Sequence, residues 1–405
     1  MTVPRRMGFA VALLSTALSA GLLAGPALAS DDRIERGIAS GMRAAALGQD
    51  ATVYVRDVST DAAVADEGGD ERQIPASTMK VMTAATALLS LGEAHRFATR
   101  VSSGAAVGRI VLVGGGDPLL TRSDIADLAA RTARKLKQAG TTSVVVDVDD
   151  YLFPQPSDAD GWAPGDRPTY AAAVRPLGFV GEYSNDTVAS VWSGFVSDLQ
   201  AKGIAARAGN RTVAAEGASR IAVIRPHTLR EAVGLMLRVS ENNVAEILFR
   251  QVALAQGYPA TWSGASSAAH EVLRSLGLAT WRLRLIDGSG LSGRNRLTAD
   301  SLAEVLDIAL GDPRLDALID GLPVAGRSGT LINRFAAPPA SCARGEVAAK
   351  TGSLTGVSTL AGVTQGRDGA WRSFAIMVNQ RPNAYPTSAT SLAIDSLAAV
   401  VQGCA

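Results

Sequence analysis

The stretch PASTMKVMTAATALLSLG, residues 75–92, decides the fold of this chain. Ser77 stands where a helix would begin, and the residues after it are apolar on most faces of that helix until Gly92 ends it. We therefore predict a helix over residues 77–90. Because a helix that is apolar on most faces is usually buried, this one is expected at the centre of the molecule.

Lys80 is the one charged residue of this stretch, and it follows Ser77 by three positions. Residues three apart share one face of a helix. A serine hydroxyl needs a base to become a good nucleophile, and burial lowers the pKa of a lysine towards the range where it can be that base. Ser77 and Lys80 are thus a candidate nucleophile and base. A helix cap followed by a solvated lysine would explain an isolated pair of this kind.

Two more motifs follow, Ser240-Glu241-Asn242 after a predicted helix at 228–239, and Lys350-Thr351-Gly352 at the end of a predicted strand. Serine, lysine and asparagine motifs in this order are typical of penicillin-reactive serine enzymes. The chain has five lysines, and two of them, Lys80 and Lys350, lie in the motifs. Since a partly buried lysine can lose its proton and an arginine cannot, this placement strengthens the assignment.

Each motif residue has a chemical role in such a site. Ser240 can relay a proton, and Asn242 can hold a substrate amide and orient Lys80. Lys350 offers a fixed charge to a substrate carboxylate, and Thr351 offers a second donor. The remaining predictions concern the backbone: Gly352 lets a substrate approach the strand, and the N–H groups of Ser353 and Ser77 form an oxyanion hole.

Strand-like segments near both ends of the chain, with helices between them, predict an α+β fold. The strands are expected at 51–58, 347–351, 358–364 and 373–378, and a final helix at 387–401. Residues 96–225 have a different texture, with their own strands, a helix and a loop rich in Pro, Asp and Gly. We predict a discontinuous catalytic domain, 30–95 and 226–405, whose antiparallel sheet is covered by helices, and one smaller inserted α/β domain, 96–225.

The first 29 residues have the pattern of a signal peptide: Arg5 and Arg6, an apolar run at 8–24, and Ala27-Leu28-Ala29 before a cleavage site. The protein is therefore expected to be exported and to work outside the cytoplasm, in the cell wall or periplasmic space. Membrane association is expected only if this segment is retained.

The charged and sulfur-containing residues limit the other possibilities. A net charge of +1 gives no electrostatic reason to expect nucleic acid as a partner. The only two cysteines, Cys342 and Cys404, suggest a disulfide in an exported protein, although two free thiols are the alternative. The histidines are scattered without the spacing of metal ligands, so neither a metal nor a cofactor is predicted.

The chain resembles the D-alanyl-D-alanine carboxypeptidase/endopeptidase family, the type 4 low-molecular-mass penicillin-binding proteins. The shared stretches are PASTMK at 75–80, GGGDPLL at 114–120, SENNVAE at 240–246, DGSGLS at 287–292, SGTL at 328–331 and AKTGSLTGV at 349–357. The resemblance implies a β-lactamase/transpeptidase-like domain, peptidoglycan stem peptides as substrate, and β-lactam antibiotics as covalent inhibitors. It places the nucleophile on Ser77, the base on Lys80, the second wall on Ser240 and Asn242, and carboxylate recognition on Lys350 and Thr351.

Three departures from the family pattern stand out. Glu241 replaces the usual aspartate, and the insert is too short for two extra domains. The family's tryptophan-aspartate stretch has its counterpart in WAPGD, residues 162–166, followed by Tyr170. We predict that Trp162 and Tyr170 bind substrate, with packing of the loop as the alternative.

The predicted function is a serine D-alanyl-D-alanine carboxypeptidase, and the sequence leaves open whether it also acts as an endopeptidase. Two other functions compete with this one. A class A β-lactamase would carry a glutamate in an ExxLN string, and this chain has none. A non-catalytic binding protein of the cell wall would usually have lost the serine or a lysine, and all of them are present.

Overall fold

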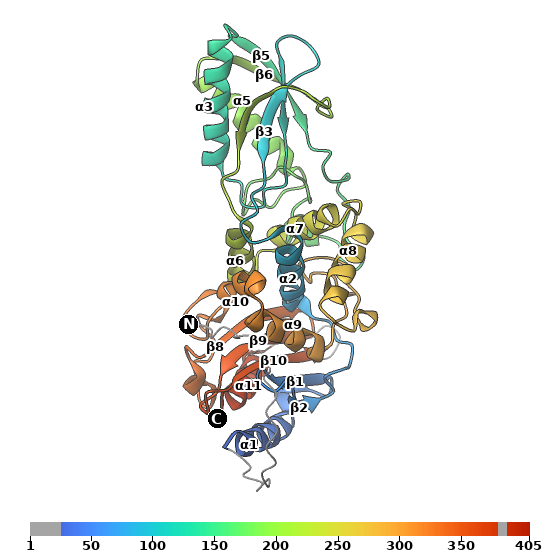
Figure 1. Cartoon of the computed structure of the whole chain (residues 1–405), viewed down its shortest axis with the longest axis vertical. Helices are drawn as coiled ribbons and strands as arrows, with labels where there is room; N and C mark the ends of the chain where they lie inside the picture. Colours follow the sequence, from blue (N-terminus) through green and yellow to red (C-terminus); the bar gives the residue numbers. More distant parts are fainter. Residues whose placement is uncertain (1–25, 380–386) are drawn as a thin grey trace, which may run out of the picture. The chain divides into compact units, whose positions relative to one another are not determined.

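The computed structural model describes residues 26–379 and 387–405, which form two compact units (Figure 1). The first unit contains the residues up to Thr78 together with Leu297–Ala405, and the second contains Met79–Arg296. The predicted boundaries at 95/96 and 225/226 group the chain differently and stay a prediction. Residues 1–25 of the predicted signal peptide, 1–29, lie outside the described residues.

The first unit is built on a five-stranded antiparallel sheet with the strand order β2-β1-β10-β9-β8. Its strands come from both ends of the chain, so that Ala51 of β1 lies opposite Val378 of β10. The elements of this unit are α1 (Pro26–Gly41), η1 (Ala45–Leu47), β1 (Ala51–Asp57), β2 (Ala63–Glu67), η2 (Ala76–Thr78), α9 (Ala299–Gly311), η4 (Pro313–Leu315), α10 (Asp316–Gly321), η5 (Gly329–Leu331), η6 (Ala340–Ala343), β8 (Val347–Leu354), β9 (Val357–Gln365), β10 (Trp371–Asn379) and α11 (Ser388–Gln402).

Helices cover both faces of this sheet. Successive side chains of a strand point to opposite faces. On β1, Val53 and Val55 join a core with α1 and α11, whereas Arg56 pairs with Asp307 of α9 at 3.5 Å. The predicted antiparallel sheet with helices around it is therefore confirmed.

A disulfide lies near the C-terminus, in the first unit. Cys342 of η6 and Cys404, which follows α11, have their sulfur atoms 2.06 Å apart and their Cα atoms 6.0 Å apart. The bridge links the last residues of the chain to the segment that precedes β8.

The second unit contains a five-stranded mixed sheet with the order β6-β5-β4-β3-β7. The pairs β4–β5 and β5–β6 are parallel, and the pairs β3–β4 and β3–β7 are antiparallel. Its elements are α2 (Met79–Leu91), β3 (Thr99–Ser103), β4 (Arg109–Val113), α3 (Arg122–Gln138), β5 (Ser143–Asp149), α4 (Asp166–Thr169), α5 (Thr187–Ala201), β6 (Ala205–Arg211), β7 (Arg220–Ile224), α6 (Leu229–Val239), α7 (Asn242–Ala255), α8 (Trp262–Ser275) and η3 (Thr280–Arg282).

Two helices, α3 and α5, lie side by side along this second sheet (Figure 1). Val144, Val146 and Val148 alternate along β5 and pack in one core with Leu128 of α3 and Phe195 of α5. Residues 99–224 thus have a sheet and a core of their own. The predicted α+β fold is confirmed, and the second sheet indicates a second domain.

Helix α2 is the central helix of the second unit, where it packs against α6, α7 and α8 (Figure 1). Every residue from Met79 to Leu88 is buried, as the apolar sequence predicts. The regular helix begins at Met79, two residues later than predicted, because Ala76–Thr78 form a tighter 3₁₀ turn. In residues 26–379 and 387–405, no helix is both long and apolar enough to cross a bilayer.

Candidate active site

The predicted site residues fall into both units. Ser77, Lys350, Thr351, Gly352 and Ser353 belong to the first unit. The second unit holds the other five, Lys80, Trp162, Tyr170, Ser240 and Asn242.

The turn that carries Ser77 is tied to the sheet of the first unit. The hydroxyl groups of Thr78 and of Thr359 on β9 both donate to the carbonyl oxygen of Pro75, at 2.7 and 2.8 Å. Ala76, fully buried, has a φ of 46°, a left-handed conformation that costs a non-glycine residue about 1–3 kcal/mol. The surrounding contacts therefore hold Ser77 on a strained backbone.

Gly352 of β8 lies against this turn so closely that a side chain would not fit. A Cβ atom at this position would be 2.9 Å from the Ser77 nitrogen, 2.8 Å from the Pro75 oxygen and 2.2 Å from the Thr359 hydroxyl. From the sequence, Gly352 was predicted to let the substrate approach the strand. The structure adds a second reason for glycine, the approach of the backbone that carries Ser77.

Lys350 is fully buried on β8, and its ammonium group donates to the carbonyl oxygen of Thr351 at 2.7 Å. The Thr351 hydroxyl donates to the hydroxyl of Thr330 at 2.8 Å, and Ser353 is exposed two residues further along the strand. Thr330 belongs to the SGTL stretch, to which the sequence analysis gave no role.

Lys80 has no exposed surface although it is charged in its ordinary state. Its Nζ donates to Oδ1 of Asn242 at 2.7 Å and to the carbonyl oxygen of Ser289 at 2.8 Å. Burial lowers the pKa of Lys80 to about 8, against the smaller opposing effect of negative charge on Glu246, Asp287 and Glu241. With this pKa about a tenth of the lysine is neutral at pH 7, far more than at its ordinary value of 10.5, as a general base requires.

Asn242 opens α7, and its amide group is oriented by two partners. Oδ1 accepts from Lys80, while Nδ2 donates to the carbonyl oxygen of Tyr170 at 2.8 Å. Because an ammonium group can only donate and a carbonyl oxygen can only accept, one orientation of the amide satisfies both. The structure thus brings Lys80, Asn242 and the backbone of Tyr170 together.

Ser240 lies between two helices in a left-handed conformation, with a φ of 64° at the end of α6. This conformation turns the chain so that α7 can begin two residues later. Glu241 has a partner of its own, since its Oε2 accepts from the hydroxyl of Tyr183 at 2.6 Å. Burial and then this hydrogen bond raise the pKa of Tyr183.

The loop that carries Trp162 and Tyr170 contacts the surroundings of Lys80. The indole N–H of Trp162 donates to Oδ2 of Asp287 at 2.8 Å, and its ring meets Trp262 edge to face. The Tyr170 side chain is 57% exposed.

Sequence reasoning gave no role to Glu246 and Asp287, two fully buried carboxyl groups near Lys80. Asp287 accepts from the backbone N–H groups of Gly290 and Ser292 and from the side-chain amide of Asn295. Both carboxyl groups lie in stretches shared with the family, SENNVAE and DGSGLS. A usable signal was present, since Glu246 follows Asn242 by one helical turn within an otherwise apolar segment.

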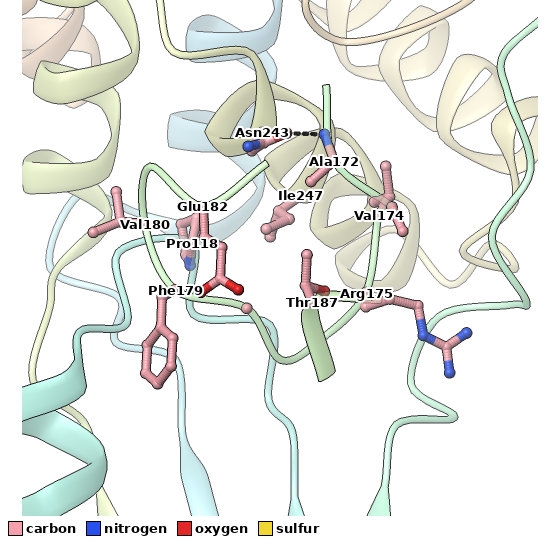
Figure 2. A pocket seen from close by; sticks show the side chains of 12 residues that line it. Pro118, Ala172, Val174, Arg175, Phe179, Val180, Glu182, Thr187, Asn243 and Ile247 are labelled. Atoms are coloured by element: carbon pink, nitrogen blue, oxygen red, sulfur yellow. Dashed lines mark hydrogen bonds between the residues drawn. The ribbon is translucent and has the colours of Figure 1, made fainter. Parts of the chain in front are cut away.

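A cavity lies next to Asn243, and its lining differs from the predicted active site (Figure 2). Its wall is formed by residues 172–175, 178–180, 182 and 187 together with Pro118, Asn243 and Ile247, and none of the predicted site residues is among these described residues. The side chain of Asn243 accepts from the backbone N–H of Ala172 at 2.6 Å. This bond holds the segment after Tyr170 on the first turn of α7.

Metal ligands are not gathered anywhere in the described part of the chain: no group of three or more His, Cys, Asp or Glu side chains there could hold a metal ion.

Known carboxypeptidases resemble this chain over most of its length. The family model described as D-Ala-D-Ala carboxypeptidase 3 (S13) matches residues 35–190 and 180–401. Carboxypeptidase DacB of Mycolicibacterium smegmatis is 36% identical over 399 residues, 91% of this chain and 84% of that protein. The D-alanyl-D-alanine carboxypeptidase of an Actinomadura species is 30% identical over an alignment of 423 positions, gaps included, that covers 81% of this chain and 77% of that one.

The fold is also found among solved structures. Penicillin-binding protein 4 (DacB) of Haemophilus influenzae superposes with a TM-score of 0.77 at 21% identity, over 89% of this chain and 97% of that one. The same protein has been solved in complex with a β-lactam. The chain therefore belongs to the D-Ala-D-Ala carboxypeptidase 3 (S13) family, which confirms the predicted family and, with it, the class of serine-type D-alanyl-D-alanine carboxypeptidases.

Proposed function

We propose that this protein removes the terminal D-alanine from peptidoglycan stem peptides through an acyl-enzyme on Ser77, with Lys80 as the base. The observation that carries the proposal is the state of Lys80: it is fully buried, it donates to Asn242 and Ser289, and burial lowers its pKa to about 8. A solvated lysine that merely follows a helix cap would have none of these properties.

In the acylation step, neutral Lys80 takes the proton of the Ser77 hydroxyl as Oγ attacks the carbonyl carbon between the two D-alanines. The resulting oxyanion accepts hydrogen bonds from the backbone N–H groups of Ser77 and Ser353. When the C–N bond breaks, the leaving D-alanine takes the proton that Lys80 had accepted, relayed through Ser240, and Lys80 is neutral again. The products of this step are free D-alanine and an ester on Ser77.

In the deacylation step, water attacks the ester carbonyl, and Lys80 accepts one proton of that water. Collapse of the intermediate returns a proton to Oγ of Ser77 and releases the shortened stem peptide. A β-lactam would acylate Ser77 in the same way, but the broken amide stays tethered in the product and blocks the approach of water. Lys350 and Thr351 are proposed to bind the carboxylate that stem peptides and penicillins share.

The proposed location and domain organisation of the protein are those predicted from its sequence. We propose export by the signal segment, residues 1–29, action in the cell wall or periplasmic space, and a catalytic domain of residues 30–95 and 226–405 interrupted by the insert 96–225. Trp162 and Tyr170 are proposed to contact the stem peptide with the face of the indole ring and with the exposed phenol.

Labelling with a fluorescent penicillin tests the catalytic proposal. Wild-type protein should form a covalent adduct that survives denaturation, and S77A should form none. S396A is a matched control, because it removes the hydroxyl of a serine on α11 that donates to the carbonyl oxygen of Leu392 in the same helix. If the wild type stays unlabelled, or if S77A is labelled equally well, Ser77 is not the nucleophile.

The substrate is tested with purified stem pentapeptide and with cross-linked dimers. Release of D-alanine from the pentapeptide is the expected result, and cleavage of the dimers would add endopeptidase action. Fast turnover of penicillin, with no lasting adduct, would instead indicate a β-lactamase. Binding of wall fragments without any release of D-alanine would indicate a non-catalytic protein.

A further inference from the structure

Glu246 is a carboxyl group with no exposed surface on the buried side of α7. Each of its two oxygens accepts one backbone hydrogen bond, from the N–H of Gly288 at 2.9 Å and from the N–H of Ser289 at 2.8 Å. Two backbone donors of this kind stabilise the ionised form of a carboxyl group. The proposed mechanism leaves this group without a role.

The turn that Glu246 holds is the turn that contacts Lys80. The carbonyl oxygen of Ser289 accepts from Lys80 at 2.8 Å, and the carbonyl oxygen of Gly288 accepts from Thr83 of the same helix at 2.6 Å. Space behind the turn is closed, since a Cβ on Gly288 would be 2.5 Å from the oxygen of Ala245. Glu246 therefore connects α7 to Lys80 through a single residue, Ser289.

The charged and titratable groups around Glu246 come from each element packed against it. Lys80 belongs to α2, Asp287 to the turn, and Arg250 to α7. Glu241, which precedes α7, acts on Lys80. Arg250 is engaged elsewhere: it donates to the carbonyl oxygen of Ala260 at 2.8 Å and lies 3.8 Å from the centre of the Trp262 ring.

Two opposing effects act on the proton of Glu246. Burial, followed by the negative charge of Asp287, raises its pKa to about 7, while the backbone donors of Gly288 and Ser289 act in the opposite direction. The charge of Glu246 in turn favours the protonated form of Lys80. The carboxyl group is thus placed to affect both the position and the protonation of the lysine.

We propose that Glu246 is a positioning residue for the reaction: through the 288–289 turn it fixes the carbonyl that binds Lys80, and through its negative charge it sets the pH at which Lys80 becomes neutral. This inference rests on the proposed role of Lys80 as the base. A purely structural role for Glu246 would affect folding and the maximal rate, but not the pH at which the rate falls.

The test is the pH dependence of acylation by a fluorescent penicillin, measured as a second-order rate constant for the full chain. E246Q removes the negative charge that favours the protonated form of Lys80. Lys80 should therefore lose its proton at lower pH, and the midpoint of the acid limb should move to lower pH by about one unit. The maximal rate should also fall, since a Gln side chain cannot accept from both N–H groups. D147N is the matched control: Asp147 is a buried carboxylate of the same unit, on β5, that accepts from the backbone N–H of Asn210. Its acid limb should coincide with that of the wild type.

E246D provides a second variant in case E246Q does not fold, as judged by thermal melting. Its side chain is one methylene shorter, so the negative charge is kept but lies further from the 288–289 turn. The acid limb should therefore also move to lower pH, but less far than in E246Q. An acid limb that stays in place, or moves to higher pH, in the folded variants overturns the role of Glu246 alone. A wild type that penicillin never acylates overturns the proposed function and this inference with it.

Discussion

The predicted site residues have different kinds of surroundings in the two units. In the first unit, the neighbourhood of Ser77 is fixed by backbone atoms: the Pro75 carbonyl accepts two hydroxyl groups, and Gly352 leaves no room for a Cβ. In the second unit, Lys80 is surrounded by side chains and carbonyl groups, with the buried carboxyl groups of Glu246 and Asp287 nearby.

This difference predicts two different responses to substitution. The backbone part of the site has no proton to gain or lose near neutral pH, so damage to it should lower the rate equally at every pH. The lysine part depends on burial and charge, so damage to it should change the pH dependence. The predictions below use this contrast, starting with the largest expected effect.

Replacement of Lys80 by methionine should have the largest effect, because it removes the base and keeps an unbranched side chain of similar length. General bases typically contribute 10²–10⁴-fold, so acylation by penicillin should fall by about 10³-fold and lose its acid limb. The measurement is the second-order rate constant over pH 6 to 10. K137M, which changes an exposed lysine of α3, is the control. A loss of less than tenfold in K80M would show that another group takes the proton.

Gly352→Ala should lower acylation by about 10²-fold, because an added Cβ would displace the Ser77 backbone, and misplacement by about 1 Å has an effect of this size. The acid limb should stay in place, in contrast to the E246Q variant. Gly362→Ala is the control, since a Cβ there would be 2.2 Å from a carbonyl oxygen of β8, at Ala348, and away from Ser77. Both variants should melt at lower temperature. Equal rates in the folded fraction of both would refute a specific role of Gly352.

Wild-type acylation should depend on pH through Lys80. Its ordinary pKa is 10.5, and burial lowers the value to about 8. Since the neutral form is the base, the rate should rise about tenfold per pH unit below pH 8 and level off above it. An exposed lysine would instead let the rate rise towards pH 10. The measurement is the rate constant for the free enzyme between pH 5 and 10, with melting curves to exclude unfolding. A flat profile from pH 6 to 8 would contradict the assignment of Lys80.

The sequence predicted those parts of the structure that depend on local patterns. The apolar periodicity after Met79 predicts the buried α2, and the strand before Gly352 is found as β8, extended to Leu354. The antiparallel sheet was predictable because strands from both ends of the chain must pair when helices fill the middle. The residues that decide each single helix or strand lie close together in the chain, whereas the pairing of the strands was inferred from their order along it.

Contacts between distant segments were beyond the reach of the sequence. The bond from Trp162 to Asp287 joins residues 125 positions apart, and the bond from Lys80 to Ser289 joins residues 209 apart. The positive φ of Ala76 is equally hidden, because alanine gives no local signal for a left-handed conformation. Such features depend on packing around the site, and no short-range pattern encodes them.

Trp162→Phe should have the smallest effect and should separate substrate binding from support of the site. The variant keeps an aromatic ring but loses the N–H bonded to Asp287, an interaction worth ~1.5 kcal/mol, or roughly tenfold. Asp287 keeps its bonds from Ser292 and Asn295, so the turn near Lys80 should hold its place. We therefore expect kcat/KM for stem pentapeptide to fall up to about tenfold, and acylation by penicillin to fall less.

The matched control is Trp192→Phe, which removes an indole N–H bonded to the carbonyl oxygen of Val146 in the second sheet. It should lower the melting temperature without changing either rate. Because penicillin lacks most of the stem peptide, an equal fall of both rates in W162F would mean that Trp162 only supports Asp287 and the turn next to Lys80. The proposed contact of its ring with the substrate would then be wrong, and the 162–170 loop would belong to the side of the site that positions the base.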